Sequence, residues 1–99
     1  MVIELHEDAE RELGEAATYY EERRAGLGKK LVRAFSDACA FLEHHPRVGR
    51  PVGATSLGAR RWIVEGFPYS IVYRVMDDSI YIVAIAHGKR RPGYWMHRL

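Results

Sequence analysis

The run Ser79-Ile-Tyr-Ile-Val-Ala-Ile-Ala86 decides the fold of this chain. After the serine every residue is apolar or aromatic, and isoleucine and valine dominate, which is the composition of a buried β-strand. Because both alternating sets of side chains are apolar, both faces of this strand must be covered. The sequence therefore predicts a sheet with residues 79–86 in its interior.

Two further strands lead up to this run. Residues 60–65 (Arg-Arg-Trp-Ile-Val-Glu) and residues 69–75 (Tyr-Ser-Ile-Val-Tyr-Arg-Val) are rich in β-branched and aromatic side chains. Gly66-Phe67-Pro68 separates the first from the second, and a tight Asp77-Asp78 turn follows the second. Connections this short force neighbouring strands to pair antiparallel, so we expect a three-stranded β-meander.

The first half of the chain has the spacing of two helices. One apolar stripe follows Glu7-Asp8, whose negative charge suits a helix N-terminus. A second stripe ends at His44-His45-Pro46, where proline stops a helix, and Gly26 and Gly28 separate the two. The stripes consist of Ala9, Leu13, Ala16, Ala17 and Tyr20, and of Leu27, Leu31, Phe35, Ala38 and Leu42. This pattern predicts a helical hairpin.

These elements predict an α+β fold in two layers. Residues 1–5 form a strand-like segment before the hairpin, and residues 47–59 have the glycines and proline of a surface loop. The apolar stripes of the hairpin need a partner, and one face of a small antiparallel sheet supplies it. The expected order is β-α-α-β-β-β. Because a chain of this length forms one core, we expect a single domain over residues 1–99.

Composition and charge restrict the class of protein. Hydrophobic residues make up 47% and charged residues 28%, as in an ordinary globular protein, and a single cysteine excludes an internal disulfide. No segment approaches the ~20 apolar residues of a membrane span. The chain begins with a strand pattern and not with a signal peptide, so we expect a cytoplasmic location. Residues 1–45 carry six Lys or Arg against ten Asp or Glu, net −4, whereas residues 46–99 carry nine against three, net +6. The basic half is the candidate interaction surface.

The segment Ala86-His-Gly-Lys-Arg-Arg-Pro-Gly-Tyr-Trp95 holds the candidate binding residues. Its glycines and its proline predict a loop of defined shape. Cations that alternate with aromatic side chains suit a phosphate-rich or acidic partner. The alternative is a solvated basic tail in which Tyr94 and Trp95 only cover the core.

Two stretches carry a resemblance to a known family. In this order of elements, Phe67-Pro68-Tyr69-Ser-Ile-Val-Tyr73-Arg74 and the segment from Ala86 to Trp95 resemble the RelE/ParE toxin superfamily of bacterial type II toxin–antitoxin systems. His6-Glu7-Asp8-Ala9 with Glu12-Leu13, and Tyr19-Tyr20-Glu21, fit the same pattern. The resemblance implies a toxin that a cognate antitoxin neutralises. It also implies one of two activities: RelE-like members are ribosome-dependent mRNA endoribonucleases, whereas ParE-like members poison DNA gyrase without catalysis.

The nuclease interpretation needs a base, cations that stabilise charge, and an acid. Its candidates are His87 as the base, Arg61, Arg74 and Arg90 as the cations, and Tyr94 as a stacking group or acid. The RelE-like branch has lysines on the strand that matches residues 60–65. Here the only cationic residues of that strand are arginines, which are poor proton shuttles. The ParE-like branch is therefore favoured, and an inactive module that only binds the antitoxin is a third interpretation. The expected target-binding residues are Lys89, Arg90, Arg91, Tyr94 and Trp95.

Partners and cofactors follow from the same resemblance. No cofactor is implied, and His44-His45 lacks nearby further ligands for a metal. The antitoxin is expected on the helical hairpin and the outer strands, in a hetero-oligomer. Its expected contacts are Leu13, Tyr20, Leu31 and Phe35. Arg74 has a structural alternative, which is an ion pair with Glu65 or Asp77.

Overall fold

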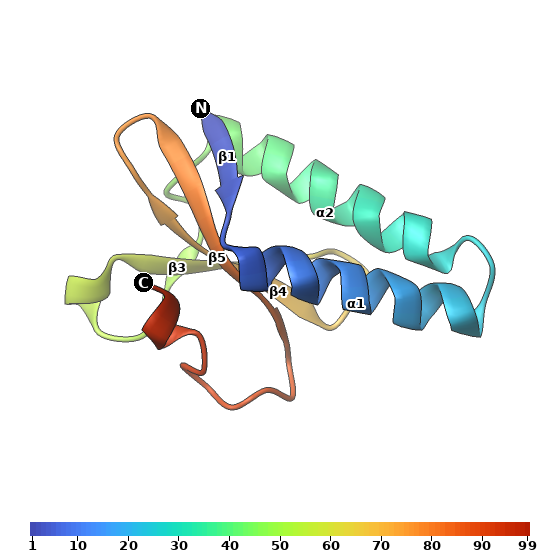
Figure 1. Ribbon diagram of the computed structural model, residues 1–99. Helices are drawn as coiled ribbons and strands as arrows, with labels where there is room; N and C mark the ends of the chain where they lie inside the picture. Colours follow the sequence, from blue (N-terminus) through green and yellow to red (C-terminus); the bar gives the residue numbers. More distant parts are fainter.

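The computed structural model describes residues 1–99 apart from the side chain of Thr55, and within them two helices lie against one face of a five-stranded sheet (Figure 1). The strands are β1 (Val2–Leu5), β2 (Arg50–Pro51), β3 (Ala59–Ile63), β4 (Tyr69–Val75) and β5 (Ser79–His87). The helices are α1 (Glu7–Arg23) and α2 (Leu27–His44), with short 3₁₀ turns η1 (Thr55–Leu57) and η2 (Met96–Arg98). The predicted α+β architecture and its helical hairpin are confirmed. No helix in the described part of the chain is long and apolar enough to cross a membrane.

The strands follow the order β1-β5-β4-β3-β2 across the sheet. β3, β4 and β5 form the predicted antiparallel meander, and β5 lies in the interior between β1 and β4. The prediction of an antiparallel sheet is wrong at one edge, because β1 pairs with β5 in parallel. The long connection between them, which includes both helices, imposes no antiparallel constraint. Within the predicted loop, Arg50–Pro51 adds a short edge strand to β3.

A β-bulge in β5 explains how this strand buries side chains on both faces. Val72 pairs with Ala84 and Tyr73 pairs with Ile82, so Val83 is an extra residue on β5. A bulge shifts the alternation of side chains by one position. Ile80 and Ile82 before it and Ile85 after it therefore all pack toward the helices, whereas Val83 and Ala84 pack on the opposite face.

The two helices are tied together at the turn between them. Gly26 has a positive φ of 88° and precedes α2. The carboxylate of Glu21 in α1 accepts hydrogen bonds from the N–H groups of Gly26 (2.9 Å) and Gly28 (3.0 Å). These bonds, that from Gly26 first, lower the pKa of Glu21. A Cβ at Gly28 would lie 2.5 Å from the carbonyl oxygen of Ala17, so the close approach of the helices requires glycine here.

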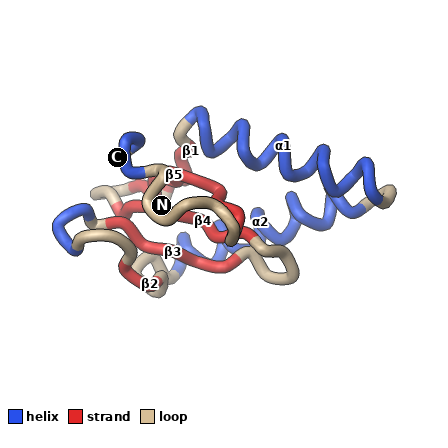
Figure 2. The backbone as a smooth tube through the Cα atoms, turned by 90° about the horizontal axis from the view of Figure 1, so that it is seen from below, coloured by secondary structure: helices blue, strands red, loops and turns tan.

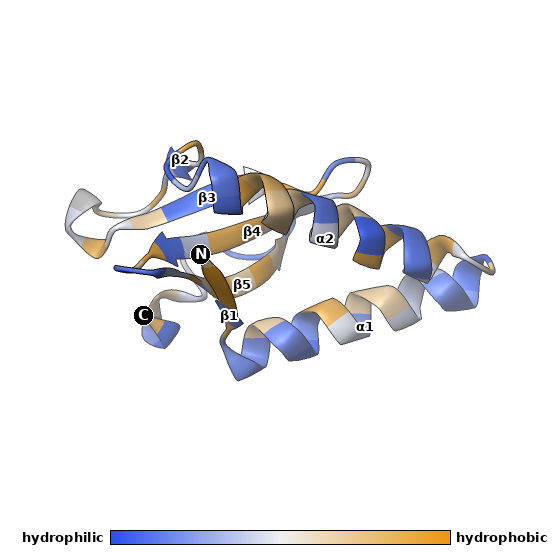
Figure 3. Ribbon diagram, turned by 90° about the horizontal axis from the view of Figure 1, so that it is seen from above, coloured by the Kyte–Doolittle hydropathy of each residue, from blue (hydrophilic) through white to orange (hydrophobic). Residues whose placement is uncertain are grey.

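The sheet separates two apolar clusters. The cluster on the helix-covered face joins both helices to β4 and β5, and Figure 3 shows the hydrophobic colouring of these strands. On the opposite face, residues 88–99, here called the C-terminal segment, run back below the strands after β5 (Figures 1 and 2). Tyr94 and Trp95 of this segment pack there against Ala59, Val72 and Val83.

Candidate functional site

Glu12 lies where α1, β5 and the C-terminal segment meet. Its side chain is 7% exposed. Oε1 accepts hydrogen bonds from the N–H of Ile85 (3.0 Å) and from Nη1 of Arg98 (2.9 Å). Oε2 accepts from the hydroxyl of Tyr94 (2.8 Å) and from Nη2 of Arg98 (3.1 Å). One carboxylate therefore satisfies a backbone donor of β5 and two side chains of the C-terminal segment.

Arg98 forms a two-pronged ion pair with Glu12 and is itself almost fully buried, with a side chain that is 4% exposed. Its Nη1 also donates to the carbonyl oxygen of Val83 (3.2 Å). Its Nε has no hydrogen-bond partner among the described residues and lies 3.7 Å from Oδ2 of Asp8. Forked pairs of this kind fix geometry as well as charge. In the sequence, Glu12 belongs to the stretches that resemble the family, but sequence reasoning gives neither Glu12 nor Arg98 a role in the site. The available signal was the position of Glu12, three residues after Ala9 and four before Ala16, on the inward stripe of the helix.

The same contacts set the ionisation of the cluster. Burial raises the pKa of the Glu12 carboxyl, but hydrogen bonds from Arg98, Tyr94 and the Ile85 N–H outweigh it and bring this pKa below its ordinary value. Burial, and then the hydrogen bond to Glu12, raises the pKa of the Tyr94 phenol. The hydrogen bond to Glu12 raises the pKa of Arg98. Glu12 is therefore ionised and Tyr94 neutral around neutral pH.

The structure divides the predicted target-binding residues into two groups. Tyr94 and Trp95 are only 9% and 5% exposed, so their rings cover the sheet. Lys89 and Arg91 are exposed. Arg90 is also exposed, over 53% of its side chain, but its guanidinium stacks over the Tyr94 ring at 3.8 Å and lies 3.9 Å from Oε2 of Glu12. The aromatic pair thus anchors the segment, and the cations provide its outer surface.

A cleft of about 480 Å³ lies between the C-terminal segment and the sheet. Arg61, Arg90 and Arg91 line it, and no carboxylate is among the described residues around it. Arg61 also pairs directly with Arg50 across β3 and β2. Like charges in adjacent positions repel unless an anion lies nearby. The cleft therefore suits a negatively charged group of a partner.

Four of the five candidate nuclease residues line the cleft between the C-terminal segment and the sheet: Arg61, His87, Arg90 and Tyr94. The ring of His87 packs edge-on against Tyr69, which belongs to the helix-covered face. Arg61 and Arg74 pair with Val72 and Ala59, which belong to the opposite face. The Tyr94 hydroxyl is bonded to Glu12. The cleft therefore brings most of this set together, but the ring of His87 packs on Tyr69 and the hydroxyl of Tyr94 is already bonded to a carboxylate. Among the described residues, Arg74 has no ion pair with Glu65 or Asp77 within 4 Å.

Two of the four predicted antitoxin contacts are core residues. Leu31 and Phe35 belong to the buried cluster of the helix-covered face, which leaves them little or no surface for a partner. Leu13 and Tyr20 are partly buried, and Tyr20 packs between Phe67 and Tyr69. Helical periodicity identified the inward stripe correctly, but an inward stripe serves the protein's own core.

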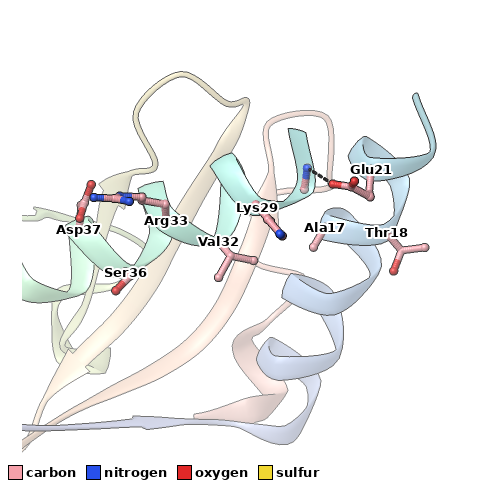
Figure 4. A pocket seen from close by; sticks show the side chains of 9 residues that line it. Ala17, Thr18, Glu21, Lys29, Val32, Arg33, Ser36 and Asp37 are labelled. Atoms are coloured by element: carbon pink, nitrogen blue, oxygen red, sulfur yellow. Dashed lines mark hydrogen bonds between the residues drawn. The ribbon is translucent and has the colours of Figure 1, made fainter. Parts of the chain in front are cut away.

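The exposed surface of the hairpin contains a groove between the two helices. It has a volume of about 870 Å³, and Figure 4 shows Ala17, Thr18 and Glu21 of α1 on one side of it and residues of α2 on the other. Val32 in this groove is 44% exposed. The described residues around it carry both signs of charge, with Lys29 and Arg33 opposed by acidic side chains.

The described residues contain no site for a metal ion and no reactive thiol. No three His, Cys, Asp or Glu side chains among them form a group that could hold a metal ion. Cys39 is buried in α2, and burial, followed by the charge of Glu43, raises the pKa of its thiol to about 11. This thiol is therefore protonated and unreactive at neutral pH.

Comparison with known proteins identifies relatives over almost the whole chain. A family model described as "ParE toxin of type II toxin-antitoxin system, parDE" matches residues 3–92. The chain is 27% identical over 90 residues to Toxin ParE2 of Mycobacterium tuberculosis, in strains CDC 1551 / Oshkosh and ATCC 25618 / H37Rv. That alignment covers 91% of this chain and 84% of the relative.

A solved structure described as "Chromosomal ParDE TA system from P. aeruginosa" has a similar fold, with a TM-score of 0.64 and 23% sequence identity. The match covers 88% of this chain and 95% of that chain. At this level of identity the likeness concerns the arrangement of helices and strands.

Proposed function

Because the chain belongs to the ParE toxin family of type II toxin–antitoxin systems, we propose that it inhibits growth by binding DNA gyrase through the exposed cations of its C-terminal segment. The observation that carries this proposal is the division within that segment. Tyr94 and Trp95 are buried against the sheet, so Lys89 and Arg91 project from a fixed base. An ordered basic surface loses less conformational entropy on binding than a mobile tail.

The contacts that already engage two of the candidate nuclease groups support a binding activity over RNA cleavage. A general base must lie within hydrogen-bond reach of the proton that it removes, and the stabilising cations must surround the same phosphate. Here the ring of His87 packs edge-on against Tyr69. Burial of Tyr94, and then the hydrogen bond that its hydroxyl donates to Glu12, raise the pKa of the phenol and make it a poor acid. A toxin that works by binding needs no such convergence.

Purified protein tests the proposed activity. We expect it to inhibit supercoiling of relaxed plasmid by gyrase and to leave complexes that contain cleaved DNA. Antitoxin added in excess should abolish both effects. Translation reactions supplied with the same protein should yield intact messenger RNA. Cuts phased with codons, together with unaffected supercoiling, would establish the nuclease instead, and growth unaffected by expression would favour an inactive module.

ParE toxins act with a cognate antitoxin. For this chain the groove between the helices is the proposed contact. A partner helix presents apolar residues at helical spacing, and an exposed apolar groove with both signs of charge at its rim suits such a helix. Val32 lies within this groove, 44% exposed, between Lys29 and Arg33.

A pair of matched variants tests the placement of the antitoxin. Val32→Asp puts a charge into the groove and should weaken antitoxin binding by roughly tenfold or more, because the new carboxylate loses solvent on binding. Met76→Asp is the control, since Met76 is 45% exposed and follows β4 at the far end of the sheet. Isothermal titration with each purified variant measures the change. Equal affinities for the two variants would move the contact away from the groove.

A further inference from the structure

The C-terminal segment is held to the rest of the molecule mainly by side chains. Its backbone hydrogen bonds from Tyr94, Met96, Arg98 and Leu99 all end on carbonyl groups within the segment itself. The N–H of Gly88 donates to the carbonyl oxygen of Pro68 at the point where the segment begins. Because no ladder of backbone bonds fixes residues 89–99 to a strand in the described structure, their position depends on what their side chains contact.

Those side-chain contacts converge on Glu12. Tyr94 and Arg98 both donate to its carboxylate, across 82 and 86 residues of sequence. The same carboxylate accepts the N–H of Ile85, which lies three residues beyond Ile82, the last residue of β5 that pairs with β1. Glu12 of α1 therefore accepts hydrogen bonds both from the C-terminal segment and from the part of β5 that lies beyond its pairing with β1.

Arg90 extends this arrangement toward the surface. Its guanidinium lies on the Tyr94 ring and 3.9 Å from the Glu12 carboxylate, so it contacts two members of the cluster. Arg91 and Lys89 are its neighbours in the chain, and both are exposed. The direction of these cations thus follows from the position of Arg90.

We infer that Glu12 is a positioning residue for the proposed target-binding surface: its carboxylate docks the C-terminal segment on the sheet and so fixes where Lys89 and Arg91 project. What those cations bind rests on the function proposed above. The docking of the segment does not, and it is measured separately below.

The charge of Glu12 is essential to this role. Within 4 Å it faces Arg98 and Arg90, and Asp8 lies 3.7 Å from Nε of Arg98 as the second carboxylate of the cluster. A buried guanidinium that loses its paired carboxylate is costly unless it moves to solvent. Neutralising Glu12 should therefore release Arg98, and with it Tyr94 and Trp95, without disturbing the apolar packing of the helices.

The test uses Glu12→Gln, which keeps the shape of the side chain and an oxygen for the Ile85 N–H but removes the charge. Glu15→Gln is the matched control, because Glu15 lies on the same helix, is exposed and pairs with Arg11. Both variants are made with Trp62→Phe, which leaves Trp95 as the sole tryptophan. Readouts are amide hydrogen exchange of residues 88–99, Trp95 fluorescence, and the reactivity of the Cys39 thiol.

We expect roughly tenfold or faster exchange in residues 88–99 and a red-shifted Trp95 emission in Glu12→Gln alone, since a charge-assisted hydrogen-bond network is lost. Cys39 should stay protected in both variants, which shows that the helix-covered face is intact. Inhibition of gyrase should fall roughly tenfold in Glu12→Gln and remain unchanged in Glu15→Gln.

Arg98→Lys provides a second route if Glu12→Gln does not fold. It keeps the positive charge but loses the forked geometry, and it should loosen the same residues to a smaller extent. Unchanged exchange and unchanged Trp95 emission in a folded Glu12→Gln or Arg98→Lys would overturn the inference. If the wild type leaves gyrase unaffected, the proposed function fails, but exchange and fluorescence still decide whether Glu12 docks the segment.

Discussion

The two faces of the sheet are covered in different ways. On the helix-covered face, apolar stripes of α1 and α2 pack on Ile71, Ile80 and Ile82 in one cluster of buried side chains. On the opposite face, a short segment without regular backbone pairing to the strands is fastened by Tyr94, Trp95 and one buried ion pair. The strength of the first contact depends on the buried apolar area, whereas that of the second depends on a few matched polar and aromatic side chains.

This difference predicts two levels of stability. Removing apolar area from the helix-covered face should lower the free energy of unfolding of the whole chain, because the core there joins most of the elements. Disrupting the ion pair should open the C-terminal segment alone. The following predictions test this separation, starting with the largest effect.

Leu31→Ala should have the largest effect on the helix-covered face. Leu31 is fully buried in α2, and truncation of such a leucine costs about 4 kcal/mol, from lost transfer energy and the cavity that remains. Urea unfolding followed by circular dichroism measures the loss. Val32→Ala, next to it but exposed, is the control and should change stability by less than about 0.5 kcal/mol. Similar losses for both would show that this face does not behave as a packed core.

Arg98→Met should act on the opposite face. It removes the forked partner of the buried Glu12 carboxylate and leaves only the half-exposed Arg90 at 3.9 Å, which costs about 3 kcal/mol. We expect this energy to be lost from docking of the C-terminal segment, seen as fast tryptic cleavage after Lys89 or Arg90, while Cys39 stays unreactive. The bond after Arg91 resists trypsin because Pro92 follows it. Arg91→Met, at an exposed cation, serves as the comparison. If Arg98→Met exposes Cys39 as much as Leu31→Ala does, the two faces unfold together and the separation fails.

Tyr73→Phe tests a polar anchor within the helix-covered face. The Tyr73 hydroxyl accepts the N–H of Gly49 (2.9 Å) and donates to the carbonyl oxygen of Pro46 (2.8 Å), which fixes the loop after α2. Loss of two buried hydrogen bonds should cost about 2 kcal/mol. Urea unfolding compares this variant with Tyr81→Phe, because the Tyr81 hydroxyl makes no hydrogen bond within the described structure. An equal change in both would mean that the hydroxyl of Tyr73 contributes nothing.

Acid should release the C-terminal segment before it disturbs the helices. The pKa of Glu12 is lowered in the folded state from its ordinary value of 4.5. Its contribution to stability is therefore present above pH 4.5 and is lost as the pH falls through the lower, folded value. Trp95 emission in Trp62→Phe, recorded from pH 7 to pH 2, measures this loss. Asp8→Asn removes the other carboxylate near Arg98 and should leave the transition in place, whereas Glu12→Gln should abolish it.

The two faces also differ in how far the sequence predicts them. Apolar stripes and short turns predict both helices, the meander and the central position of residues 79–86, because each of these depends on local spacing. The parallel pairing of β1 and the bulge at Val83 are not predicted. The first depends on a long connection, and in a strand that is apolar throughout, a one-residue shift leaves no trace in the pattern.

The candidate site is predicted only in part, for a similar reason. The cations of residues 89–91 are recognisable because they follow a buried strand. The exposure of Lys89 and Arg91 can be predicted from their residue type alone. The partnership of Glu12 with Arg98 joins residues 86 positions apart. A carboxylate on the inward stripe of a helix shows that a partner is needed, but not which arginine supplies it. Leu31 and Phe35 show the converse, since regular spacing marks core residues and not contacts.

The most direct test of the account is binding of purified gyrase to the Lys89→Ala/Arg91→Ala double variant. Arg24→Ala/Lys30→Ala is the control, because it also removes two exposed cations, at the tip of the helical hairpin away from the C-terminal segment (Figure 1). With folding and antitoxin binding verified for both, we predict that the first double variant binds gyrase at least about tenfold more weakly than the wild type. The control should bind as the wild type does. Equal binding by all three proteins would contradict the claim that the docked C-terminal cations form the target-binding surface.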